Sequence, residues 1–103
     1  MAVRSRRKGA DVERAVVHLH HDAGIPCEKI SRTGYTGPDL CVADTWLAEV
    51  KARRSGEGFA VLERWLEGVA LLFLKRNRHP PLVVMAWETY VALLHGQAPE
   101  RDF

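Results

Sequence analysis

The sequence has little cysteine, little net charge and no long apolar run. Its 103 residues include two cysteines, Cys27 and Cys41, too few for the disulfide framework of a small secreted domain. No secretory signal pattern precedes them, so we expect an intracellular protein. Apolar runs such as Val69 to Leu74 are a fraction of the length that spans a bilayer, which argues against a membrane protein.

The formal net charge of +2 does not by itself indicate a nucleic-acid-binding protein, but the distribution of charge does. Four cations precede Asp11, the first acidic residue: Arg4, Arg6, Arg7 and Lys8. Such a cluster can follow a phosphate backbone and release its counterions. A solubilising tail or a targeting peptide is the alternative interpretation of the same cluster.

Length and an apolar content of 47% favour one compact domain with a modest core. Hydrophobic periodicity and the positions of glycine and proline predict the order αβββαβα and an α/β fold. The predicted helices cover residues 11–23, 58–77 and 87–94, and the predicted strands cover 26–31, 39–42, 46–51 and 82–86. We expect a basic arm over residues 1–10, a domain over 11–96 and a polar tail over 97–103.

Two carboxylates and a lysine are predicted to meet on one β-hairpin. Pro38 fixes its own φ, and Asp39 then begins the first strand of the hairpin. Side chains two apart on a strand share a face, so Glu49 and Lys51 project to the same side of the second strand. If the strands pair, Asp39 lies beside Glu49.

This residue set suits metal-assisted hydrolysis of a phosphodiester. Two carboxylates and water are typical ligands of Mg²⁺, which shares its other positions with substrate phosphates. A neighbouring lysine can orient the attacking water and offset charge that develops on the phosphorane. The alternative is that an Asp, a Glu and a Lys fall at this spacing by chance on the solvated face of a hairpin.

The segment before the hairpin, residues 29–36, is basic, rich in hydroxyls and contains glycine, as expected of a loop that contacts phosphates. Arg32 and Tyr35 are its candidate DNA contacts. Arg53 and Arg54 follow the hairpin and extend the set of candidate phosphate-binding cations.

Pro38-Asp39 followed by Glu49-Val50-Lys51 resembles the PD-(D/E)XK nuclease superfamily. The opening Arg6-Arg7-Lys8-Gly9, with Glu13 on the helix that follows, is similar to the archaeal-type Holliday junction resolvases of that superfamily. The resemblance implies a restriction-endonuclease-like domain, with a central mixed β-sheet flanked by helices. It also implies that Asp39 and Glu49 bind the metal, that Lys51 is the catalytic lysine and that Glu13 assists metal or water binding.

We therefore expect a structure-selective, Mg²⁺-dependent endodeoxyribonuclease that resolves four-way DNA junctions, with Mn²⁺ as a possible substitute. Its partner would be branched double-stranded DNA, and its location the cytoplasm or nucleoid, or the host cytoplasm if the protein comes from a phage. The alternatives are another endonuclease of the superfamily, restriction-like or nicking, and a DNA-binding module without catalysis.

The resemblance implies a homodimer as well. In the helix predicted over residues 58–77, the apolar run Ala70 to Leu74 wraps most of the way around the helix and leaves a face for a second subunit. Coverage of this surface by the closing helix over residues 87–94 is the alternative.

Overall fold

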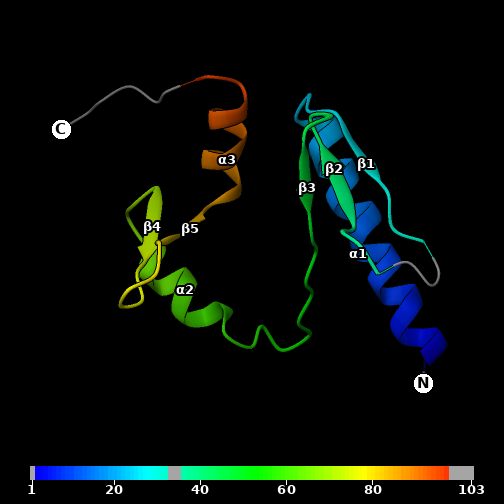
Figure 1. Ribbon diagram of the computed structural model, residues 1–103, viewed down its shortest axis with the longest axis horizontal. Coiled ribbons are helices and arrows are strands. Elements are labelled where there is room, and N and C mark those ends of the chain that lie inside the picture. Colours follow the sequence, from blue (N-terminus) through cyan, green and yellow to red (C-terminus); the bar gives the residue numbers. More distant parts are fainter. Residues whose placement is uncertain (1, 33–35, 98–103) are drawn as a thin grey trace. The chain divides into compact units, whose positions relative to one another are not determined.

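The computed structural model describes residues 2–32 and 36–97, and it describes side chains from Gly9 onward. Its contacts divide the chain into two compact units, Met1–Arg53 and Arg54–Phe103. The described elements are three helices and five strands in the order αβββαββα (Figure 1). The expected mixed α/β character is confirmed.

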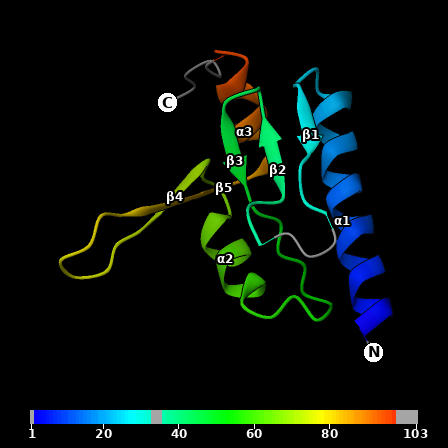
Figure 2. The same cartoon turned by 45° about the vertical axis from the view of Figure 1, so that its right-hand side comes forward.

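The first unit is a helix packed on a small antiparallel sheet. Helix α1 (Ala2–Asp22) contacts β1 (Cys27–Lys29), which is the neighbour of β2 (Leu40–Val42), and β2 pairs in turn with β3 (Trp46–Ala48). Figure 2 shows the three strands side by side, with α1 running along β1. The central strand β2 therefore has a backbone partner on each side.

The end of α1 is closed by the glycine predicted to stop it. Gly24 has a φ of 75°, a left-handed conformation that glycine adopts without steric cost. Its N–H donates to the His21 carbonyl at 3.0 Å, and the N–H of Ile25 donates to the His20 carbonyl at 2.8 Å. This pair of bonds is a Schellman motif, which satisfies the last carbonyls of the helix and turns the chain toward β1.

The core of the first unit lies between α1 and the sheet. Its buried apolar residues are Ile25, Cys27, Leu40 and Val42. The imidazole Nε2 of His21 lies 2.8 Å from the Cys27 carbonyl, which joins the end of α1 to β1 through a side chain. Helix and sheet are thus held by apolar burial and by a polar contact.

Cys27 should be the less reactive of the two free thiols. It is 7% exposed, and burial raises its pKa, with smaller contributions from Cys41 and Glu28. Because the thiolate is the reactive species, iodoacetamide should label Cys27 more slowly than the half-buried Cys41 in native protein. Peptide mass mapping after timed labelling measures both rates, and the urea-unfolded chain, where the rates should converge, is the control. Equal native rates would contradict the burial of Cys27.

The raised pKa of Cys27 also determines how the stability of the fold changes with pH. Because the folded pKa of Cys27 lies above its unfolded value, the unfolded chain loses this proton first. The protonated Cys27 thiol therefore contributes to the free energy of unfolding in full below the unfolded pKa of the thiol. This contribution is lost as the pH rises through the folded pKa.

The β2–β3 hairpin closes as predicted, over Ala43-Asp44-Thr45. Ala43 and Asp44 have φ values of 52° and 54°, and the Thr45 N–H donates to the Val42 carbonyl at 3.0 Å. Two left-handed residues in succession reverse the chain tightly, so Val42 pairs with Trp46 and Leu40 pairs with Ala48. This register decides which residues meet at the open end of the hairpin.

The second unit contains a hairpin between two helices. Helix α2 (Phe59–Leu66) contacts β4 (Leu71–Leu74), which pairs antiparallel with β5 (Leu82–Met85), and α3 (Trp87–Leu94) follows. Leu72 and Leu74 are half-buried, whereas Leu71 and Phe73 are exposed, so β4 has one covered face. No residue in the described part of this unit reaches the burial of the four core residues of the first unit.

Three sequence predictions are corrected here. The helix predicted over residues 58–77 ends at Leu66, because Gly68 takes a φ of 77° and the apolar run after it forms β4. The first helix begins at Ala2 instead of residue 11, so the basic arm forms the first turns of α1. The strand predicted over residues 46–51 ends at Ala48.

The structure also bears on the expected mixed β-sheet, on the last predicted strand and helix, and on the expectation that the protein does not cross a membrane. The described strands form two antiparallel sheets and no mixed sheet. The strand predicted over residues 82–86 and the helix over 87–94 agree with β5 and α3. Among the helices of the described residues, none combines the length and apolarity needed to cross a membrane.

Candidate functional site

The two candidate metal-binding carboxylates lie at the open end of the β2–β3 hairpin. Leu40 pairs with Ala48, and Asp39 and Glu49 are the next residues outward on the two strands. The Asp39 N–H donates to the Ala48 carbonyl at 2.9 Å, one residue out of the register in which Leu40 pairs with Ala48. Asp39 and Glu49 therefore lie next to the last paired residues, at the same end of the hairpin.

Asp39 is anchored from both neighbouring strands. Its carbonyl accepts bonds from the N–H groups of Ile30 at 2.9 Å and Ser31 at 3.2 Å, beyond the end of β1. Its carboxylate Oδ2 accepts the Val50 N–H at 2.8 Å. A backbone bond to a carboxylate oxygen fixes its orientation, so Asp39 is held in place before any ligand arrives.

Lys51 lies beside Glu49, although the strand has ended. Its Nζ is 3.9 Å from Glu49 Oε2, and the two side chains are 67% and 60% exposed. An exposed ion pair at this distance contributes little to stability, because solvent screens it. Both groups are therefore available to a ligand at small energetic cost.

Glu13 reaches the same end of the sheet through Ser31. The Ser31 hydroxyl lies 2.7 Å from Oε1 and 3.1 Å from Oε2 of the Glu13 carboxylate, to which it donates. Ser31 also donates its backbone N–H to the Asp39 carbonyl. One residue thus connects the carboxylate of α1 to the strand that carries Asp39.

The three carboxylates are not a preassembled cage. Within the described residues, no three acidic, histidine or cysteine side chains are grouped closely enough to hold a metal ion. Asp39 and Glu49 nevertheless form the kind of donor set that Mg²⁺ uses, one or two carboxylates with water and substrate phosphates completing its octahedron. The chemistry of this pair fits Mg²⁺, and it fits Mn²⁺, which also prefers oxygen ligands.

Several predicted DNA contacts can be located, and others cannot. Arg32, Arg53 and Arg54 are exposed, and Arg53 donates to the adjacent Ala52 carbonyl at 3.0 Å. Tyr35 lies outside the described residues. The arm cations lie on the first turns of α1, but their side chains are also outside the described part: Arg4, Arg6, Arg7 and Lys8.

Sequence reasoning placed Ser31 only within a general phosphate-binding loop and missed its contact with Glu13. The β1–β2 register could have indicated it, since Lys29 pairs with Leu40 and the following residues therefore lie beside Asp39. Sequence reasoning also missed a cleft in the second unit beside the loop between β4 and β5, because that stretch was assigned to a helix and its end.

Fold and site together define a mixed α/β protein in which two carboxylates and a lysine meet at the open end of an antiparallel hairpin. Comparisons of the chain with protein-family models, with curated proteins and with solved structures gave no match.

Proposed function

We propose that this protein is a Mg²⁺-dependent, structure-selective endodeoxyribonuclease with a PD-(D/E)XK active site, and that its substrate is a four-way DNA junction. The observation that carries the proposal is that Asp39 and Glu49 lie next to the last paired residues at one end of the hairpin, with Lys51 Nζ 3.9 Å from the Glu49 carboxylate. The restriction-endonuclease-like arrangement of the superfamily is part of this proposal.

Each residue of the site has a distinct role in the proposal. Asp39 and Glu49 would hold the metal, which when bound supplies Lewis-acid stabilisation of the charged phosphoryl oxygens. Lys51 would leave its weak pairing with Glu49 to orient the attacking water and to offset charge at the scissile phosphate. Glu13, positioned by Ser31, would accept a hydrogen bond from that water.

Phosphate contacts would come from the exposed cations around the site. Arg32 and Arg53 belong to the same unit as the carboxylates, as does the basic first half of α1. Contacts to phosphates position DNA without reading its sequence, so selectivity would depend on the shape of the branched substrate.

We also propose that the protein acts as a homodimer, since a two-fold assembly matches two symmetric cuts. The apolar run that first indicated a dimer forms β4 and not a helix, so the support is different. It consists of apolar side chains exposed in the second unit, including Val69 at 55% and Leu93 at 58%.

A cleavage assay tests the proposal. A four-way junction and a linear duplex with the same arm sequence are incubated with the protein, each in Mg²⁺ and in EDTA. We expect paired, symmetric nicks in the junction only, and only with Mg²⁺. Equal cutting of both substrates would indicate a general or restriction-like endonuclease, and binding without cutting would indicate a DNA-binding module.

A further inference from the structure

The loop that joins β4 and β5 is strongly basic. Residues 68–87 contain no aspartate or glutamate, yet the loop carries Lys75, Arg76, Arg78 and His79. All four are exposed, so the charges of Lys75, Arg76 and Arg78 face solvent. Such a concentration of positive charge on one hairpin complements a polyanion.

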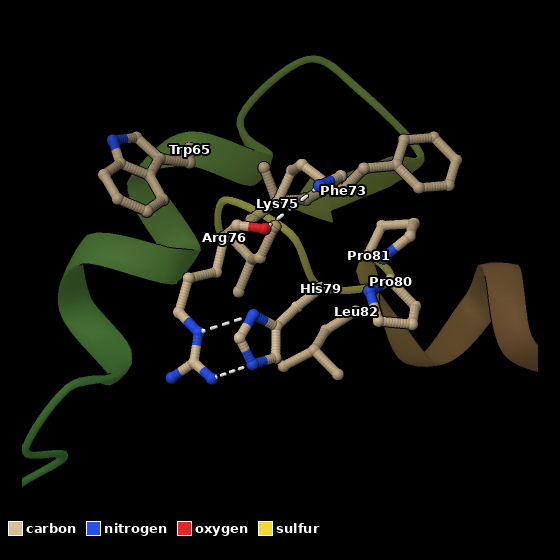
Figure 3. A pocket seen from close by; sticks show the side chains of 10 residues that line it. Trp65, Phe73, Lys75, Arg76, His79, Pro80, Pro81 and Leu82 are labelled. Carbon is tan, nitrogen blue, oxygen red and sulfur yellow. Dashed lines mark hydrogen bonds between the residues drawn. The ribbon is translucent and has the colours of Figure 1, made fainter.

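A cleft of about 760 Å³ lies beside this loop, within the second unit (Figure 3). Trp65 comes from α2, and the other labelled residues belong to the hairpin and its loop. Much of the lining consists of rings, namely Trp65, Phe73, His79, Pro80 and Pro81. Trp65 is 52% exposed and Phe73 is 61% exposed, so flat apolar faces are open to a ligand.

Arg76 lies against His79 at the cleft. The guanidinium Nε lies 3.2 Å from His79 Nδ1, which is also 2.9 Å from the Asn77 carbonyl oxygen, and the terminal Nη2 contacts the other ring nitrogen (Figure 3). Lys75 donates to the Arg76 carbonyl at 3.0 Å, which orders the beginning of the loop. A cation restrained by neighbours loses less side-chain entropy when it binds a ligand.

We propose that this cleft is a second nucleic-acid site, which binds an unpaired DNA strand with one base stacked between its rings. Lys75, Arg76 and Arg78 would contact the flanking phosphates. Grooves that bind single strands combine these two features, positive charge that follows the backbone and aromatic faces on which bases stack. A cleft of this size falls within the range of small-ligand sites.

The inference rests on the proposed action on branched DNA, because bases at a branch point lose part of their stacking and cost less to extrude than bases within a duplex. The cleft would then bind a strand that leaves the helix, while the carboxylate site cuts. A site of this kind distinguishes single-stranded from double-stranded DNA and not one base sequence from another, because any base can stack on an aromatic ring.

Fluorescence of a single tryptophan tests the proposal directly. In a chain with Trp46→Phe and Trp87→Phe, Trp65 is the remaining tryptophan. Titration with oligothymidylate in EDTA should quench its emission, whereas a blunt duplex of equal length should quench it much less. No quenching by oligothymidylate, or equal quenching by the duplex, would overturn the proposal.

Affinity measurements on matched variants complete the test. Trp65→Ala and Arg76→Ala should each weaken oligothymidylate binding by about tenfold, the effect expected of one lost stacking or charge-assisted contact. Trp46→Ala, which removes a tryptophan 61% exposed, and Arg64→Ala, which removes an exposed cation of α2 outside the cleft lining, are the controls and should change affinity less than twofold. Equal effects of test and control variants would overturn the proposal.

The two proposals fail separately. Oligothymidylate binding is measured in EDTA and needs no cleavage, so quenching of Trp65 without any nuclease activity would leave the cleft as a single-strand site and refute the nuclease. Junction cleavage by the wild type, with unchanged strand affinity in Trp65→Ala, would refute the cleft instead.

Discussion

Asp39→Ala, Glu49→Ala and Lys51→Ala should each lower Mg²⁺-dependent junction cleavage by at least about a hundredfold, with binding of the junction in EDTA within about twofold of wild type. Loss of one preorganised group that stabilises developing charge costs on the order of 10²–10³ in rate. The measurement is single-turnover cleavage, paired with a binding titration of the same variants.

The structure explains why binding and cleavage should separate. Glu49 and Lys51 are 60% and 67% exposed, so their truncation leaves no cavity. Asp39 accepts the Val50 N–H, and its loss frees a single backbone donor at the partly exposed end of the hairpin. None of the three substitutions removes Arg32 or a cation of the basic arm, so the contacts that these cations make with phosphates should persist.

Glu28→Ala is the matched control. Glu28 is an exposed carboxylate of the same sheet, on β1 opposite Cys41, in the middle row of the sheet and not at its end. Its removal changes net charge by the same amount as Glu49→Ala and should leave cleavage within about twofold, as for most surface substitutions. Undiminished cutting by all three site variants would refute the active-site assignment.

Leu40→Ala should destabilise the first unit by about 2–5 kcal/mol, the largest effect on stability that we expect of a single truncation there. Leu40 is 1% exposed and lies on the central strand, between Lys29 of β1 and Ala48 of β3. Removing its branched end forfeits the transfer free energy of that end and leaves a cavity that the backbone pairing on both sides keeps from closing.

Urea unfolding followed by circular dichroism measures this loss, and Leu47→Ala provides the control. Leu47 lies on β3 opposite Cys41 and is 66% exposed, so the same chemical change should cost no more than about 0.5 kcal/mol. Equal destabilisation by the two substitutions would contradict the placement of Leu40 in the core. Because Asp39 precedes Leu40, we also expect Leu40→Ala to weaken cleavage.

The sequence predicted the hairpin and its turn, because these depend on local signals. Pro38 precedes the first strand, and Ala43-Asp44-Thr45 separates two short apolar runs. Once the turn is fixed, the register places Asp39 and Glu49 at the same end of the hairpin, next to Leu40 and Ala48. The end of α1 was predictable for a similar reason, since Gly24 fits the left-handed position that closes it.

The apolar stretch after Gly58 shows where local pattern reached its limit. A helical period runs from Phe59 through Leu66, and the following apolar residues keep that period by coincidence. Leu71–Leu74 pairs with Leu82–Met85, and pairing with this neighbouring strand makes the segment a strand despite its helical pattern. Gly68 was a possible stop signal within the predicted helix.

The sequence by itself determined the identity and order along the chain of the candidate site residues: Asp39, Glu49 and Lys51 at and after one hairpin, and Glu13 on the preceding helix. Turn chemistry and side-chain alternation act over a few residues, so they can be read from the chain. Only the tertiary structure decided that Ser31 positions Glu13 and that Trp65 meets Arg76 and His79 at one cleft. These contacts join residues far apart in sequence or in different elements, and they depend on how the strands pair and on how the helices pack against them.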